Sequence, residues 1–225
     1  MKTERPAIEK VHVGRKARAL KDPYSGVRLA PLDDYMLSVF ICEGSVPWHR
    51  HFDEDELFLV YTGAITVDSE IGPVFLRPGE VTVVPKGVGH RSASPIRSEV
   101  LLFQPRLLAD RHNGDRRLYA MADDGTLGKV NLYAAAMNLA AYVPQRVVSI
   151  GHFALNLTVC QGLSGQRVNP KHSTLLLTQQ GEMKLSTEGG DLDLFVGDIV
   201  VIPREVPFTL SADKRSLLLE FSHDE

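Results

Sequence analysis

Short apolar runs separated by glycine, proline and acidic residues recur along most of the chain. In the first half they are three to eight residues long and cover 27–29, 35–42, 57–61, 65–68, 74–76, 81–84 and 100–103. Runs of this length that are rich in β-branched and aromatic residues are typical of strands in a sandwich or barrel. The pattern therefore predicts an all-β fold.

Two segments depart from the strand pattern. Apolar periodicity stops between Pro105 and Gly128, where Arg and Asp cluster as in a linker. Apolar residues at helical spacing then predict a helix over 130–142, namely Leu132, Ala135, Ala136 and Leu139. Residues 11–21 fit either a short helix or a strand. We therefore predict a first domain over 1–105, a linker over 106–128 and a second domain over 129–225.

The second half of the chain repeats the first at a constant offset of 118 residues. The matching pairs are Cys42 and Cys160, Gly63 and Gly181, Gly79 and Gly197, Pro85 and Pro203, and Phe103 and Phe221. Agreement without a gap over this length indicates two copies of one β-barrel unit.

Metal-ligating residue types gather in the first copy. His49 and His51 stand at i and i+2, so on an extended strand both side chains leave the same face. Glu56 opens the next apolar run, and His90 follows a glycine turn after the run at 81–84. Three imidazoles and one carboxylate suit one divalent ion such as Fe, Mn, Ni or Zn.

The second copy has lost these residue types. The offset places Arg167, Asn169, Thr174 and Phe208 where the first copy has His49, His51, Glu56 and His90. A guanidinium stays protonated and a phenyl ring has no donor atom, so we expect no metal in the second copy. The glycines and strands persist there without the ligands, which favours a functional role for the ligands in the first copy.

The two stretches resemble the motifs of the cupin superfamily. The chain reads G-x4-H-x-H-x4-E-x6-G from Gly44 to Gly63, and G-x5-P-x-G-x2-H from Gly79 to His90. The first gap is one residue shorter than usual, and Ser94 stands where the family often has Asn. The resemblance implies the metal ligands His49, His51, Glu56 and His90. Asp55 also lies within the family's permitted gap, but the spacing to Gly63 favours Glu56.

The resemblance further implies two tandem cupin barrels of the jelly-roll (double-stranded β-helix) kind with short helices between them. The first barrel is similar to the single-motif cupins called mannose-6-phosphate isomerase-like, and the second is a degenerate copy. Cupin metal sites serve several chemistries, so the resemblance fixes the ligands better than the reaction. We expect a metal-dependent enzyme acting on a small polar metabolite, with dioxygenase chemistry ahead of isomerisation or epimerisation, and a non-catalytic metal- or ligand-binding module as the alternative.

Composition adds limits on partners and setting. The chain has 225 residues, a net charge of −3 and no basic run, which argues against nucleic acid as a partner. No uncharged apolar stretch approaches the roughly 20 residues of a membrane span. Two cysteines without metal or disulfide spacing favour a reducing, cytoplasmic setting. Strands such as 57–61 and 175–177 are apolar at consecutive positions, which predicts sheet-on-sheet packing within the chain or across a homodimer.

Overall fold

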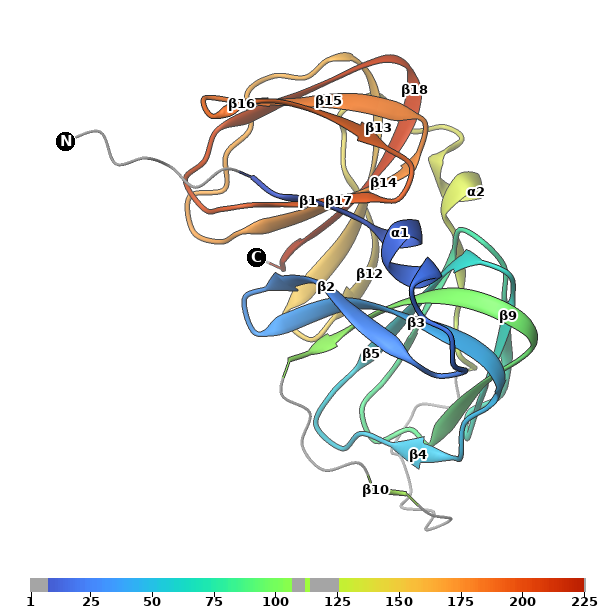
Figure 1. Cartoon of the computed structure of the whole chain (residues 1–225). Helices are drawn as coiled ribbons and strands as arrows, with labels where there is room; N and C mark the ends of the chain where they lie inside the picture. Colours follow the sequence, from blue (N-terminus) through green and yellow to red (C-terminus); the bar gives the residue numbers. More distant parts are fainter. Residues whose placement is uncertain (1–7, 107–111, 114–125, 225) are drawn as a thin grey trace. The chain divides into compact units, whose positions relative to one another are not determined.

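The computed structural model of the chain describes residues 8–106, 112–113 and 126–224, and they form two antiparallel β-sheets (Figure 1). The predicted all-β fold is confirmed. By compactness the chain divides into residues 14–133 and a second unit that joins 1–13 to 134–225. Most of the predicted linker at 106–128 lies outside the described residues, and the predicted domain boundaries stay a prediction.

The unit of residues 14–133 contains the sheet of the first repeat. Its strands are β2 (Gly26–Leu32), β3 (Tyr35–Ser45), β4 (His49–Arg50), β5 (Glu56–Thr62), β6 (Ile65–Ser69), β7 (Val74–Leu76), β8 (Glu80–Val84), β9 (His90–Pro105), β10 (His112–Asn113) and β11 (Val130–Asn131). The long strand β9 pairs with β3, β4, β5 and β6, so four strands of the sheet are hydrogen-bonded to it.

The other unit contains the sheet of the second repeat. Its strands are β1 (Lys10–His12), β12 (Gln145–Ile150), β13 (Phe153–Leu163), β14 (Thr174–Gln180), β15 (Glu182–Thr187), β16 (Gly190–Phe195), β17 (Asp198–Ile202) and β18 (Phe208–His223). Here β18 pairs with β13, β14 and β15, as β9 does with β3, β5 and β6.

Residue pairs across neighbouring strands of the first sheet recur in the second sheet at the same offset of 118 residues. Tyr35 pairs with Pro105 in the first sheet, and Phe153 pairs with His223 in the second. His49 pairs with His90, and an isolated bridge joins Arg167 to Phe208. The two copies therefore agree in pairing as well as in sequence.

Each sheet ends on a strand that precedes a short helix. Strand β11 pairs with β8 in the first sheet and leads into α2 (Leu132–Ala136). Strand β1, at the start of the chain, pairs with β17 in the second sheet and leads into α1 (Val13–Arg18). The segment at 11–21 thus contributes both a strand and a helix.

The prediction of one helix over 130–142 is wrong in extent. Val130 and Asn131 are extended because they pair with Val81 and Glu80 of β8. The helix then runs only from Leu132 to Ala136, and Met137 beyond it is 73% exposed. Val130 and Asn131, which helical spacing assigned to the first turn of the helix, therefore belong to a strand at the edge of the sheet.

Each barrel has its own apolar interior. The first core cluster includes Cys42, Phe58, Ile65 and Val100, and the second includes their repeats Cys160, Leu176, Met183 and Leu218. Both cysteines are completely buried and unbonded to sulfur. Along β5 the residues of both faces are buried, from Leu57 to Val60.

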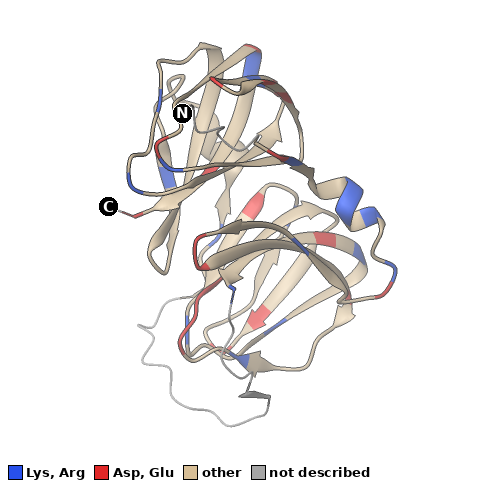
Figure 2. Cartoon of the chain, turned by 60° about the vertical axis from the view of Figure 1, so that its left-hand side comes forward, with Lys and Arg blue, Asp and Glu red and all other residues tan. Residues whose placement is uncertain are grey.

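Charged residues are scattered over strands and loops of both units (Figure 2). Helix α1 carries Arg15, Lys16 and Arg18 in its last turn, where cations complement the helix dipole. Among the described residues, no helix has the length and hydropathy needed to span a bilayer.

Candidate metal centre

Three strands begin at one place in the first barrel, and each begins with a predicted ligand. His49 is the first residue of β4, Glu56 of β5 and His90 of β9. His49 and His90 pair directly across β4 and β9, whereas His51 follows the end of β4. The fold thereby brings together residues that lie up to 41 positions apart in the sequence.

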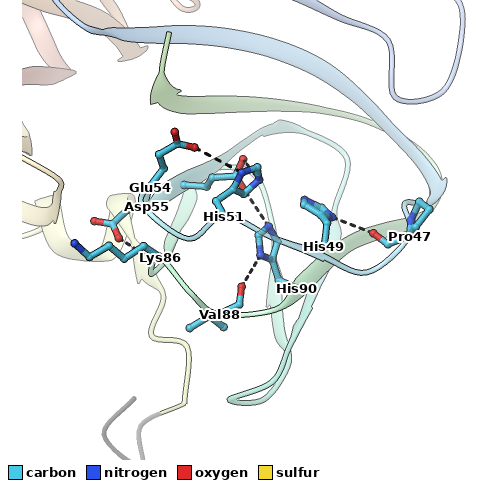
Figure 3. A network of polar contacts seen from close by, with 9 residues as sticks. Pro47, His49, His51, Glu54, Asp55, Lys86, Val88 and His90 are labelled. Atoms are coloured by element: carbon cyan, nitrogen blue, oxygen red, sulfur yellow. Dashed lines mark hydrogen bonds and ion pairs between the residues drawn. The ribbon is translucent and has the colours of Figure 1, made fainter. Parts of the chain in front are cut away.

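One potential donor atom from each of His49, His51, Glu56 and His90 lies within 4.8 Å of the others. Figure 3 shows the three histidines side by side. Two ligand atoms that are each about 2 Å from one ion span roughly 4 Å, so this spacing suits a shared ion. His51, Glu56 and His90 are at most 2% exposed, while His49 is half-buried. The first barrel therefore has a cluster able to hold a metal ion.

Backbone carbonyls orient two of the imidazoles. His49 Nδ1 lies 3.0 Å from the Pro47 carbonyl oxygen, and His90 Nδ1 lies 3.1 Å from that of Val88 (Figure 3). A carbonyl only accepts, so Nδ1 carries a proton in both rings, which makes Nε2 the ring atom that could coordinate an ion. This is the arrangement that metal-binding histidines commonly show.

The contact between His90 and Glu56 fits an ion as well. His90 Nε2 is 2.8 Å from Glu56 Oε2, and His51 Nε2 is 3.3 Å from Glu56 Oε1. Because His90 Nδ1 is directed to the Val88 carbonyl, Nε2 is the ring atom that meets Glu56. A divalent cation among these atoms would satisfy the Nε2 lone pair and the carboxylate together, so the donor set fits a metal.

The surroundings keep Glu56 ionised. Burial alone would raise the pKa of Glu56, but the hydrogen bond with His90 and the charges of the three histidines outweigh burial and hold this pKa below its ordinary value. An ionised carboxylate is the form that ligates a cation.

The neighbouring acids take other positions. Asp55 Oδ1 accepts a hydrogen bond of 2.8 Å from the Lys86 backbone N–H, which fixes the turn before His90 (Figure 3). Glu54 Oε2 lies 3.7 Å from His51 Nδ1, on the side of the ring away from Glu56. The geometry thus favours Glu56 over Asp55 as the carboxylate of the cluster.

An ion pair ties the two ligand segments together. Arg50, between His49 and His51, has its Nη2 2.6 Å from Glu70 Oε1 and donates from Nη1 to the Gly87 carbonyl. Glu70 Oε2 in turn accepts from the Gly89 backbone N–H, next to His90. The Arg50 side chain is only 6% exposed, so this buried ion pair helps to hold β4 beside the start of β9.

A cavity of about 280 Å³ opens beside the cluster, and both His49 and Glu56 line it. Its apolar wall includes Val27, Val39, Val46, Phe40, Phe58 and Leu102, and its polar wall includes Tyr24, Arg28, Ser38, Ser92 and Gln104. The cavity gives a small molecule direct access to two residues of the cluster.

The corresponding place in the second barrel holds an ion pair of the protein itself. Arg167 donates from Nη1 and Nη2 to the two oxygens of Glu220, at 3.0 and 2.5 Å, and Thr158 donates to Glu220 Oε1 at 2.6 Å. Burial alone would lower the pKa of Arg167, but Glu220 outweighs it and raises this pKa. Asn169 accepts backbone N–H bonds from Lys171 and His172. A fixed guanidinium thus lies in the second barrel at the place where the first barrel has its histidine and glutamate cluster.

Comparison with known proteins agrees with this geometry. Residues 39–102, which include the four residues of the cluster, match the Cupin_2 family, described as the cupin domain. The match is to a cupin domain. The uncharacterized protein YdbB of Bacillus subtilis (strain 168) is 28% identical over 83 residues, which are 36% of this chain and 74% of that protein.

Solved structures match nearly the whole chain. A Cupin 2 conserved barrel domain protein from Leptotrichia buccalis has a TM-score of 0.74 and 11% identity, over 98% of this chain and 99% of the other. Salicylate 1,2-dioxygenase from Pseudaminobacter salicylatoxidans has a TM-score of 0.76 and 13% identity, over 96% and 84%. At these identities the likeness shows the cupin barrel fold.

Sequence reasoning missed the residues around the cluster. Arg28 and Gln104 lie on β2 and β9, remote from both motifs, and enter the cavity only through strand pairing. Glu70 lies in the loop after β6 and meets Arg50 only in three dimensions. Arg28 reaches this cavity through the pairing of β2 with β3, which no local pattern in the sequence marks.

Proposed function

We propose that the protein is a metal-dependent cupin enzyme that converts a small polar metabolite in the cavity of its first barrel, by chemistry of the dioxygenase type. The ligands are His49, His51, Glu56 and His90, and the second, degenerate barrel carries no ion. The observation that carries this proposal is that His49 and Glu56 belong at once to the cluster and to the cavity wall.

The three imidazoles and the carboxylate would hold a redox-active ion such as Fe, Mn or Ni, which would supply the activation of dioxygen that this chemistry needs. The chain's own residues do the rest. The carbonyls of Pro47 and Val88 fix the imidazole rings, and the Arg50–Glu70 pair holds the two ligand segments in register. Phe40, Phe58 and Leu102 keep bulk water from the inner wall.

The cavity lining favours oxidation over isomerisation or epimerisation. Moving a proton between carbon atoms calls for a side-chain acid or base beside the substrate. Among the described residues that line the cavity, the carboxylates and imidazoles are those of the cluster itself. Tyr24 is no base, because burial first and then its contact with Cys42 raise its pKa, and its hydroxyl donates to the Ser92 carbonyl. A sugar isomerase-like or non-catalytic role is therefore the second choice.

Metal analysis followed by oxygen-uptake measurements tests the proposal. Protein purified without added metal is assayed for bound ions and then for oxygen consumption with a panel of small hydroxylated acids, alcohols and catechols. Uptake that requires both a panel compound and the intact cluster, and that His90→Ala abolishes, supports the proposal. Turnover of a panel compound without oxygen consumption would instead support the isomerase-like alternative.

A further inference from the structure

The mouth of the cavity carries a cation that no described acidic side chain neutralises. Arg28, on β2, is exposed and lines the cavity, and no ion pair or side-chain hydrogen bond joins it to another described residue. The other arginines around the cluster are paired, Arg50 with Glu70 and Arg91 with Asp68. Arg28 is thus the guanidinium left available to a molecule in the cavity.

Strand pairing points Arg28 toward the cluster's side of the sheet. Arg28 pairs with Ser38 across β2 and β3, Ser38 with Leu102 across β3 and β9, and Leu102 with Phe58 across β9 and β5. Side chains directly opposite one another on paired strands share a face. Glu56 lies two residues before Phe58 and so shares that face.

A buried acceptor without a partner lies on the same wall. Gln104 Oε1 is shielded from solvent and receives no hydrogen bond from the described residues. Leu57 pairs with Phe103, so the next positions along the two strands, Glu56 and Gln104, lie across from each other. A buried amide oxygen left unsatisfied costs about 1–3 kcal/mol, which a ligand that donates a hydrogen bond would recover.

We propose that Arg28 and Gln104 select the substrate, and that this substrate is a small monocarboxylate with a hydroxyl group near the carboxylate. The inference rests on the proposed function, which places the reaction at the cluster beside this cavity. The Arg28 fork binds the carboxylate at the mouth, since a guanidinium matches a carboxylate in two parallel hydrogen bonds. Gln104 Oε1 accepts from the hydroxyl beside Glu56. Phe40, Phe58 and Leu102 pack against the apolar body.

The volume limits the size of this substrate. At about 280 Å³ the cavity is slightly smaller than the roughly 300–1,000 Å³ typical of ligand pockets. A carboxylate, one hydroxyl and a single ring or short chain suit this space. Uncharged analogues should bind less well, because they leave Arg28 without its partner.

Three probes separate the two contacts. Mandelate carries the carboxylate, the hydroxyl and a ring; mandelamide replaces the charge with a neutral amide; and phenylacetate lacks the hydroxyl. Calorimetric titration of the full chain is run on chelator-stripped and on zinc-loaded protein. We expect mandelate to bind at least about tenfold more tightly than mandelamide, a difference of about 1.4 kcal/mol.

Variants assign the preferences to residues. Arg28→Gln should abolish the preference for mandelate over mandelamide, whereas Arg204→Gln, an equal charge change at an exposed turn of the second barrel, should retain it. Gln104→Leu should abolish the preference for mandelate over phenylacetate and leave the charge preference intact. Unchanged melting temperatures establish that the variants are folded.

Absence of saturable mandelate binding to the wild type, or a charge preference that survives in Arg28→Gln, would overturn the proposal. Titrations of the chelator-stripped protein distinguish failure of the anion site from failure of the proposed function. If the protein binds no metal but the Arg28-dependent preference persists in the stripped form, the proposed function fails while the anion site stands. If metal binds but the preference is missing, only the anion site fails.

Discussion

At the scale of single residues, adjacent acids have separate tasks. Asp55 fixes the turn that leads to His90 through the Lys86 backbone N–H, whereas Glu56 lies among the imidazoles. Spacing along the chain favoured Glu56 but left Asp55 in competition. The structure distinguishes them because β5 begins at Glu56 and directs its side chain into the barrel.

Glu56→Gln should weaken binding of a divalent ion by at least about tenfold, since it removes an ionised ligand while keeping the shape. Asp55→Asn keeps an oxygen that accepts from Lys86 and should leave the affinity unchanged. Competition with a chromophoric chelator measures both affinities. Equal losses in the two variants would argue against Glu56 as the ligand.

The two cysteines should be unreactive in the folded protein. Both thiols are completely buried, and burial raises the pKa of Cys42 and, together with Glu220, raises the pKa of Cys160 to about 12. The thiolate is the reactive form, so little of it is present near pH 8. A disulfide reagent should label neither cysteine in native buffer and both in denaturant; rapid labelling of native protein would show that a barrel opens readily.

At the scale of elements, tight turns hold the strands in register. Gly63 has φ +79°, and a Cβ there would overlap with Ser98, whose Cα would lie 2.8 Å away. Ser98 Oγ accepts from the Ala64 N–H, so it has little freedom to withdraw. Gly181 and Ser216 repeat this arrangement in the second barrel.

Gly63→Ala should therefore destabilise the protein more than Gly44→Ala does. Both positions have a left-handed backbone, which costs an L-residue about 1–2 kcal/mol, but a Cβ at Gly44 meets nothing within 4 Å. Urea unfolding of both variants compares the losses. A larger loss for Gly44→Ala would contradict the steric account.

Much at this scale could be predicted from the sequence, because apolar runs and glycine turns are local signals. The strand at 57–61 and the glycine at 63 are examples. The start of the predicted helix at 130–142 failed because Val130 pairs with Val81, a contact made far along the chain. Arg28 and Gln104 escaped notice for the same reason, since only strand pairing brings them to one cavity.

At the scale of the whole molecule, two copies of one fold have diverged at one place. The repeat itself was predictable because its offset is constant and its strand registers follow it. The Arg167–Glu220 pair could not be predicted from the repeat. Glu220 matches Leu102 of the first copy, an uncharged residue that does not indicate an ion pair at this position.

The Arg167–Glu220 pair allows a test of how the second barrel tolerates its charges. Arg167→Met leaves Glu220, whose side chain is 4% exposed, without its cation and should cost about 2 kcal/mol. Arg167→Met combined with Glu220→Leu removes both charges and should recover most of that loss. Urea unfolding compares the variants; a double variant less stable than the single one would contradict this explanation.

The central claim is that one barrel binds an ion through four residues and its repeat binds none. Elemental analysis of purified protein, with each variant prepared in parallel, tests it most directly. We expect about one divalent ion per chain in the wild type and in Asn169→Ala, and almost none in His51→Ala or His90→Ala, because the second barrel has no imidazole or carboxylate at the positions that match the four residues of the cluster. Two ions per chain, or an ion retained in both histidine variants, would contradict the account.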